Sequence, residues 1–256
     1  MSVNLSGQVA IVTGSAVGIG RALSTELTRL GAQVAGFDID DAGNAATADL
    51  AGPNFQPWSC DVGDDAAVKG TIDLVADRAG RIDILVNNAA VWNDTTLTGG
   101  DYYSQVAAWH QANDACSNGS FHCMAAALPY LRIRGGNVVN MITEHIRLHR
   151  LITGLPATGY DCAKFAQWRL TESWAKELSP FGIRVNGLAF GATDTPMLRA
   201  VSVRIAELGM RAEDMARAAV NIIGQGPTGV TGMTYDIGFT GTPREESLRQ
   251  IAAIAE

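Results

Sequence analysis

Short apolar segments alternate with longer helix-like segments along most of this chain. The strand-like segments are rich in β-branched and other apolar residues, and they are Val9–Thr13, 33–37, 82–86, 137–142 and 183–188. The helix-like segments are 21–30, 64–79, 105–132 and 160–178. Continuously apolar strands separated by helices are typical of a parallel sheet that helices cover on both faces. The pattern predicts an α/β fold, a single doubly wound Rossmann-type domain with a mainly parallel sheet of about seven strands.

The composition of the 256 residues, 47% hydrophobic and 18% charged, is too apolar for a disordered chain. No internal repeat, low-complexity tract or linker rich in Pro, Gly and Ser divides the sequence, so we expect one domain over residues 1–256. Residues 240–256 form a C-terminal tail in which Leu248, Ile251 and Ile254 stand among charged residues. This tail is expected to be either a short amphipathic helix or a frayed terminus.

The formal net charge of −7 and the lack of any Lys or Arg run argue against nucleic acid or an anionic membrane as a partner. Residues 1–14 lack the features of a secretory signal, and the longest uncharged stretch, 218–235, contains too many Gly, Pro and polar residues for a membrane span. The four cysteines form no CxxC pair and have no His at metal-ligand spacing. We therefore expect a soluble cytoplasmic protein with reduced thiols and no bound metal.

A glycine-rich turn follows the first predicted strand and leads into the first predicted helix. Glycines at this place let the backbone approach a pyrophosphate, whose charge is met by the amides and dipole of the helix N-terminus. The alternative is a turn with a purely structural role. We predict that the turn binds a dinucleotide through Gly14, Ser15, Val17, Gly18, Ile19 and Gly20.

An acidic residue ends the second predicted strand. Asp38 lies eighteen residues after Gly20, where a carboxylate can accept hydrogen bonds from the adenosine ribose hydroxyls and repel a 2′-phosphate. Ile39 follows it, and no Arg or Lys lies in the turn before Arg21, so the turn offers no basic partner for that phosphate. The cofactor predicted is NAD rather than NADP, and the alternative is a solvated acid at a strand end.

Together, the glycine turn, the Asp61-Val62 pair, the run 83–90 (DILVNNAA) and the Tyr160/Lys164 pair resemble the short-chain dehydrogenase/reductase family. The resemblance extends from about residue 5 to about residue 239, and the motifs follow the family's order. It implies activity on an alcohol or a ketone, and a homodimer or homotetramer formed through helices 105–132 and 160–178. It also implies further cofactor-binding residues, namely Asp61, Val62, Asn88, Ala89, Tyr160, Lys164, Gly191, Thr193 and Thr195.

Tyr160 and Lys164 carry the chemistry that this resemblance implies. Residues i and i+4 share one face of a helix, so the Lys164 ammonium can lie beside the Tyr160 phenol. A nearby cation favours the phenolate, which makes Tyr160 a usable acid/base at neutral pH. By resemblance, Lys164 also holds the nicotinamide ribose. With only five Tyr and three Lys in the sequence, this spacing is improbable by chance.

Two other catalytic positions differ from the family's usual residues. Thr143 stands at the end of strand 137–142, where the family has a serine that orients the substrate, and a threonine hydroxyl can donate the same hydrogen bond. Cys116 stands where the family has an Asn that helps to hold a water in a proton relay. A thiol is a weaker hydrogen-bonding group, although a backbone carbonyl at this place could still bind the water. Ala90 and Phe190 also depart from the family pattern.

The loop after Thr143, residues 144–159, is longer than usual in the family, and the segment from Met197 to Glu213 is shorter. We expect an open site that this loop, the region of Trp92 or the C-terminal tail closes. The loop carries His145, Arg147, His149 and Arg150, which either recognise an anionic or polyhydroxylated substrate or are solvated charges. The residues predicted to line the substrate pocket are Trp92, His145, Phe190 and Met197.

The sequence therefore predicts an NAD-dependent oxidoreductase that interconverts a secondary alcohol and its ketone. Its catalytic residues would be Thr143, Tyr160 and Lys164, with Cys116 at the position of the usual Asn. One alternative is an NADP-dependent carbonyl reductase of the same fold. The other is a dinucleotide-binding regulator without catalysis, suggested by Cys116, Ala90 and Phe190.

Overall fold

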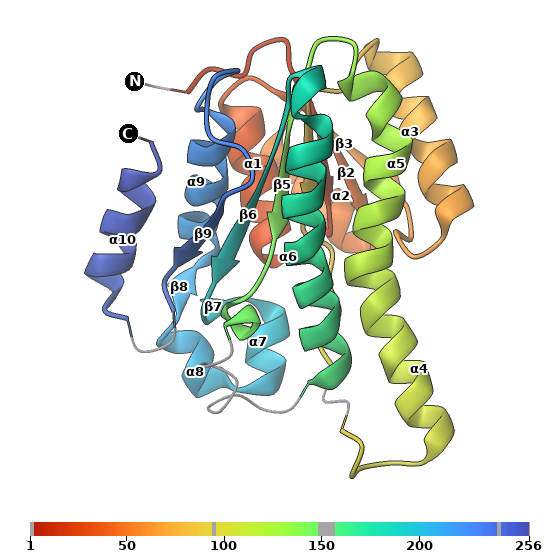
Figure 1. The fold of residues 1–256 in the computed structure, drawn as a ribbon, viewed down its shortest axis with the longest axis vertical. Coiled ribbons are helices and arrows are strands. Elements are labelled where there is room, and N and C mark those ends of the chain that lie inside the picture. The colour runs from red at the N-terminus through yellow and green to blue at the C-terminus, as the bar shows by residue number, and fades with distance from the viewer. Residues whose placement is uncertain (1–2, 94–95, 148–156, 240–241, 256) are drawn as a thin grey trace.

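The computed structural model of the chain describes residues 3–93, 96–147, 157–239 and 242–255. Its central element is a seven-stranded sheet in which every neighbouring pair of strands is parallel (Figure 1). In spatial order the strands are β3 (Phe55–Ser59), β2 (Gln33–Asp38), β1 (Val9–Thr13), β4 (Ile84–Asn87), β5 (Gly136–Met141), β6 (Ile183–Phe190) and β9 (Thr234–Ile237). This confirms the doubly wound α/β fold expected from the sequence.

Helices cover both faces of the sheet (Figure 1). One buried cluster joins strand residues such as Val12 to α1 (Gly18–Arg29), α9 (Ala212–Ile223) and α10 (Arg244–Ala253), with α2 (Asp41–Ala51) at its margin. The other joins residues such as Ile11 to α3 (Asp65–Ala79), α5 (Gly119–Leu131) and α6 (Thr158–Leu178). Ile11 and Val12 point to opposite faces because side chains alternate along a strand.

The direction in which strands are added reverses between β1 and β4. The chain first builds outward through β2 and β3, then returns to place β4, β5, β6 and β9 on the other side. In such sheets the loops at the carboxyl ends of the two central strands separate and leave a crevice, which is the usual ligand site. The topology therefore places the glycine turn after β1 beside the chain that leaves β4.

The long helix predicted over 105–132 is interrupted in its middle. The structure has α4 (Tyr102–Asn113), then a π-helical turn at Asp114–Asn118, then α5. The segment is therefore helical over the predicted range, with an interruption that the sequence did not predict. A π turn inserts an extra residue into the helical ladder and changes which side chains face inward, and such turns occur often at functional sites. Cys116 lies in this turn and is fully buried.

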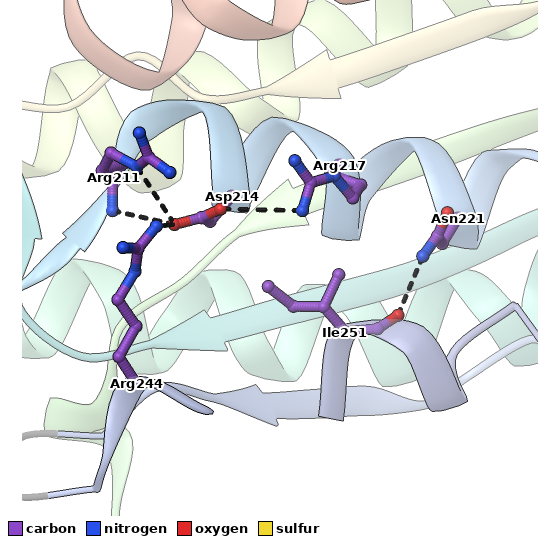
Figure 2. Close-up of polar contacts among 6 residues, drawn as sticks. All are labelled: Arg211, Asp214, Arg217, Asn221, Arg244 and Ile251. Carbon is purple, nitrogen blue, oxygen red and sulfur yellow. Dashed lines mark hydrogen bonds and ion pairs between the residues drawn. The ribbon is translucent and has the colours of Figure 1, made fainter. Parts of the chain in front are cut away.

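The C-terminal tail contains a helix, α10, so the amphipathic alternative is the one that the structure supports. Ile251 is buried against the sheet cluster, and its carbonyl accepts a hydrogen bond from Asn221 of α9 at 2.8 Å (Figure 2). At the start of α10, Arg244 donates to the buried carboxylate of Asp214 at 2.9 Å (Figure 2). These contacts fix the tail on the outside of α9.

Two shorter helices, α7 (Pro196–Val201) and α8 (Val203–Glu207), follow β6. They stand next to a small two-stranded sheet of β7 (Thr193–Asp194) and β8 (Met210–Arg211). No helix within the described residues is long and apolar enough to span a membrane. The same part of the chain has no cluster of three or more His, Cys, Asp or Glu arranged to hold a metal ion.

Candidate active site

A cavity of about 800 Å³ opens at the carboxyl ends of the central strands. Ligand sites typically enclose several hundred cubic ångströms, so this space suits a dinucleotide together with a small substrate. Most of the residues predicted for the site line it. These are Gly14, Val17, Gly18, Ile19, Asp38, Ile39, Asp61, Val62, Asn88, Ala89, Trp92, Thr143, His145, Tyr160, Lys164, Phe190, Gly191, Thr193, Thr195 and Met197.

The glycine turn forms one wall of the cavity. Gly14 and Gly18 have positive φ angles of 68° and 56°, a conformation that other residues adopt at a cost. A Cβ on Gly14 would also lie 2.9 Å from the Ala89 backbone. The turn is tied to the end of β4, because the Asn88 side chain donates to the carbonyls of Thr13 and Gly14 at 2.9 and 3.1 Å. Glycine is therefore needed here to let the backbone border the cavity.

Three of the predicted residues do not line the cavity. Ser15 is fully buried and its hydroxyl donates to Asn44 at 2.8 Å, which supports the turn from behind. Gly20 lies in the first turn of α1, where a Cβ would come within 1.9 Å of the Gly14 carbonyl. Cys116 is buried behind the cavity wall, and its neighbour Ala115 lines the cavity instead.

Asp38 is the last residue of β2, and backbone hydrogen bonds hold its carboxylate beside the glycine turn. Its two carboxylate oxygens accept backbone hydrogen bonds from Ala16 at 2.8 Å and Asp40 at 3.0 Å. Each oxygen has a further lone pair, so the carboxylate can still accept hydrogen bonds from a ligand. Arg21 is nearby, but its guanidinium donates to Thr47 and to the carbonyls of Ala16 and Gly43. Among the described residues that line the cavity, Lys164 is the sole Lys or Arg.

Tyr160, Thr143 and Lys164 meet at the opposite end of the cavity. All three side chains are largely buried, with exposed fractions of 8%, 7% and 2%. Burial raises the pKa of the Tyr160 phenol, and a hydrogen bond with Thr143 opposes that shift. The direction is opposite to the one expected from the neighbouring Lys164, because the loss of water around the phenol dominates.

Lys164 is fixed by two hydrogen bonds. Its Nζ donates to the Met141 carbonyl at 2.6 Å and to Gln167 Oε1 at 3.0 Å, and lies 5.8 Å from the centre of the Tyr160 ring. Burial lowers the pKa of the ammonium group. Because Tyr160 and Lys164 are four residues apart on α6, both side chains lie on one face of the helix, and both line the cavity.

Cys116 packs against Tyr160 in a small buried cluster with Ala157, Ala163, Ala90 and Trp92. Its carbonyl accepts a hydrogen bond from Ser120 Oγ at 2.6 Å. Ser120 in turn accepts from Gln167 Nε2 at 2.8 Å. A continuous chain of hydrogen bonds therefore leads from Lys164 through Gln167 and Ser120 to the backbone of the π turn.

Three aromatic rings gather at the part of the cavity that Tyr160 lines. Trp92 lies 4.9 Å from Tyr160 and 5.6 Å from His145, measured between ring centres. The His145 and Tyr160 rings are 6.2 Å apart and nearly perpendicular. His145 Nδ1 lies 2.7 Å from Asp161 Oδ1, so the ring is held by the residue that follows Tyr160. Phe190 and Met197 complete an apolar wall.

The segment from Met197 to Glu213, which was expected to leave the site open because it is short, covers one side of the cavity. Leu198, Val201 and Ile205 from α7 and α8 line it together with Met197. Trp92 lies on the same cavity, as expected, whereas no described residue of the C-terminal tail lines it. Arg147 points elsewhere and pairs with Asp236 at 2.8 Å. His149 and Arg150 lie outside the described residues.

Three residues of the site, Asp161, Gln167 and Ser120, were not predicted from the sequence. Asp161 carries a weak signal, because it follows Tyr160 directly. Gln167 is a polar residue on the buried face of α6, one turn after Lys164 and two turns after Tyr160, and this position is a recognisable signal for a partner of the lysine. Ser120 has no such signal, since small polar residues are common in helices.

Comparison with known proteins agrees with this geometry. The short chain dehydrogenase family model matches residues 8–205. The chain is 35% identical over 206 residues to a sorbitol-6-phosphate 2-dehydrogenase of Klebsiella pneumoniae, covering 77% of this chain and 73% of the relative. It is 30% identical over 200 residues to a 3-oxoacyl-(acyl-carrier-protein) reductase of Vibrio harveyi, covering 78% and 79%.

Among solved structures, a short-chain dehydrogenase/reductase from Burkholderia xenovorans superimposes with a TM-score of 0.83 at 29% identity, covering 93% of this chain and 97% of that one. The chain belongs to the short-chain dehydrogenase/reductase family of oxidoreductases. The family, the fold and the Tyr160/Lys164 geometry thus agree with the resemblance found in the sequence.

Proposed function

We propose that this protein is an NAD-dependent oxidoreductase that interconverts a secondary alcohol and its ketone. The observation that carries the proposal is the meeting of Thr143, Tyr160 and Lys164 in one cavity with the glycine turn. A relative named sorbitol-6-phosphate 2-dehydrogenase supports an alcohol as the substrate class.

The residues present fit a dinucleotide. The positive φ angles of Gly14 and Gly18 keep the backbone at the cavity surface free of side chains, beside the N-terminus of α1. We assign the pyrophosphate to this turn, supported from behind by Ser15 and Gly20. We assign the adenosine end of the dinucleotide to Asp38, Ile39, Asp61 and Val62. The residues assigned to the nicotinamide end are Asn88, Ala89, Tyr160, Lys164, Gly191, Thr193 and Thr195. When bound, the cofactor accepts a hydride from the alcohol carbon or returns one to the ketone.

The chain's own residues handle the substrate oxygen and its proton. Tyr160 takes the hydroxyl proton during oxidation and returns it during reduction. Thr143 donates a hydrogen bond that orients the same oxygen. Lys164 places a positive charge near the phenol, which stabilises the phenolate formed when Tyr160 has given up its proton. The apolar wall of Trp92, Phe190 and Met197 excludes water from the reacting carbon.

Asp38 supports NAD over NADP. A 2′-phosphate would bring at least one further negative charge next to a fixed carboxylate, and Arg21 is already engaged with backbone carbonyls. The alternative of an NADP-dependent reductase therefore lacks a basic partner among the described cavity residues. The alternative of a regulator without catalysis rests on Cys116, Ala90 and Phe190, none of which replaces a group that moves a proton in the proposed reaction.

Replacing Tyr160 by Phe tests the proposal. We expect the variant to lose alcohol oxidation about 1,000-fold or more, because a general acid/base contributes up to about 10⁴-fold. Binding of NADH, followed by its fluorescence, should persist. Tyr103→Phe is the matched control, since Tyr103 is 81% exposed on α4 and far from the cavity lining. Near-normal turnover by Tyr160→Phe would overturn the proposal.

We also propose a cytoplasmic homodimer or homotetramer. Three aromatic side chains on α4, α5 and α6 support self-association, because Trp109, Phe121 and Phe165 are between 40% and 53% exposed. Sedimentation at low protein concentration tests it, and a monomer would contradict it. All four cysteines are free thiols, which is the state favoured in the cytoplasm.

A further inference from the structure

The proton that Tyr160 takes from an alcohol has to leave the site before the next turnover. On the buried side, Lys164 donates to the Met141 carbonyl at 2.6 Å and to Gln167 Oε1 at 3.0 Å. Beyond Gln167 the hydrogen bonds continue to Ser120 and end on the Cys116 carbonyl. A carboxamide holds a fixed acceptor and a fixed donor and does not take up a proton near neutral pH. Beyond Lys164, this hydrogen-bonded path ends on a backbone carbonyl and contains no group that can carry the proton on to solvent.

The cavity side offers such a group in His145. Its ring lines the same cavity as Tyr160, with 6.2 Å between ring centres, and its side chain is 18% exposed. An imidazole can accept a proton at one ring nitrogen and donate one from the other, so a histidine can pass a proton on.

Asp161 determines which nitrogen of the His145 ring carries the hydrogen. A carboxylate only accepts hydrogen bonds, so the 2.7 Å contact places the ring hydrogen on Nδ1 and leaves Nε2 as the acceptor. No described residue bonds to Nε2, and Nε2 is not among the buried side-chain atoms left without a partner in that part of the chain. This nitrogen therefore has exposed surface, and the His145 ring lines the cavity.

Trp92 limits the space in which the proton can move. Its ring lies 4.9 Å from Tyr160 and 5.6 Å from His145, so an apolar surface borders both groups. An acid and a base can exchange a proton through one intervening oxygen atom, which a water or the substrate can supply.

We propose that His145 accepts the proton from Tyr160 through such a bridging oxygen and releases it to solvent, with Asp161 as the positioning residue behind it. The inference rests on the proposed function. During oxidation the alcohol would give its hydroxyl proton to Tyr160, and a bound dinucleotide would supply the acceptor for its hydride. The proton then moves from Tyr160 to His145 Nε2, and from the imidazolium to water, so that both side chains return to their starting states. Reduction of a ketone uses the same steps in reverse.

His145→Gln tests the proposal, with His110→Gln as the matched control on the exposed face of α4. The readout is NADH formation from sorbitol, cyclohexanol and isopropanol, using the alcohol that the unaltered protein oxidises fastest. We expect kcat to fall about 10- to 100-fold, with the KM for NAD unchanged. Millimolar imidazole should restore a large part of the lost rate in His145→Gln and none in Tyr160→Phe.

Asp161→Asn provides a second variant and a readout that needs no turnover. In the dinucleotide-free protein, nitrogen NMR should show His145 protonated at Nδ1, and Asp161→Asn should convert it to a mixture of tautomers while kcat falls less than in His145→Gln. A His145→Gln variant with kcat within twofold of the unaltered protein, or a loss that imidazole does not repair, overturns the inference alone. Turnover that survives in Tyr160→Phe overturns the proposed function and the inference with it.

Discussion

Asp38 gives the sharpest test of which dinucleotide the cavity accepts. Its carboxylate is fixed by backbone hydrogen bonds from Ala16 at 2.8 Å and Asp40 at 3.0 Å, and it lines the cavity. Asp38→Ala removes the acceptor proposed for the ribose hydroxyls and the charge proposed to repel a 2′-phosphate. It also frees the Ala16 amide, which loosens the turn for either dinucleotide.

The two effects on selectivity can be estimated separately. A hydrogen bond to a charged group contributes about 1.5–3 kcal/mol, so NAD should lose about 2 kcal/mol. Two charges about 5 Å apart at a partly solvated site repel by about 1–3 kcal/mol, so NADP should regain about 2 kcal/mol. The loosened turn weakens both ligands equally and cancels in their ratio. The ratio of the two dissociation constants should therefore shift toward NADP by about 4 kcal/mol, or roughly 1,000-fold.

Titration calorimetry with NAD and NADP measures this ratio without any substrate. Asp40→Asn is the matched control, because Asp40 is a neighbouring carboxylate that caps α2 and does not line the cavity. Its ratio should stay within about threefold of the unaltered protein. Asp38→Asn, which keeps one acceptor oxygen, should fall between the two.

Two results would refute this reasoning about Asp38. One is a protein that binds NADP more tightly than NAD before any substitution. The other is an Asp38→Ala variant whose ratio moves by less than threefold, which would mean that the carboxylate serves only to hold the Ala16 amide. Either result would revive the NADP-dependent alternative considered from the sequence.

Two further substitutions test the turn and the C-terminal anchor. Gly20→Ala would place a methyl group 1.9 Å from the Gly14 carbonyl, so dinucleotide binding measured by NADH fluorescence should weaken about tenfold or more, whereas Gly70→Ala, which meets nothing within 4 Å, should not change it. Unchanged binding by Gly20→Ala would contradict the close approach. Asp214→Ala should lower the free energy of unfolding by about 2 kcal/mol and Tm by about 4–8 °C. The reason is that Asp214 is buried and holds three half-exposed Arg side chains, one of which is Arg244. Figure 2 shows these contacts. Glu213→Ala, at the exposed neighbour of Asp214, should change Tm only slightly. An equal fall of Tm in both variants would rule out Asp214 as the anchor of the C-terminal helix.

The strands that could be predicted are those buried on both faces of the sheet. Those beginning at Val9 and Ile84 are apolar except for their last residue, which marks them in the sequence. The strand beginning at Ile183 is also mostly apolar, although it contains Arg184 and Asn186. Strand β3 was left unassigned because it contains Pro57 and only Phe55 in it is buried, as befits an edge strand. Strand β9, at the opposite edge, is short and half-exposed. Edge strands carry too little apolar pattern to be recognised.

The helices show the same dependence on an apolar stripe. Helix α2 buries only Asn44 and Thr47, so its sequence has no amphipathic period, and it was not predicted. Helix α9 was also left unassigned, although Met215, Ala219 and Ile222 recur at helical spacing and the signal was present. The π turn around Cys116 has no counterpart in periodicity, since it depends on how α4 and α5 pack against α6.

Within the site, residues that belong to a local motif could be predicted and those joined by long-range contacts could not. The spacing of Tyr160 and Lys164 is fixed by one helix, so the sequence alone brings them together. His145 and Asp161 are sixteen residues apart, and their contact depends on the short 3-10 helix Glu144–Ile146 that follows β5. Gln167 and Ser120 come from different helices. No local rule links such pairs.

Two residues that differ from the family pattern, Cys116 and Ala90, pack in the same cluster as Tyr160. Hydride transfer needs donor and acceptor carbons in one geometry, so the turn and the three catalytic side chains have little freedom. A proton can instead leave by any titratable group that reaches the same cavity. With Gln167 bonded to Lys164 and Cys116 buried as an apolar neighbour of Tyr160, the buried side has become an anchor. The proposed exit therefore lies on the cavity side, where Asp161 holds the His145 ring.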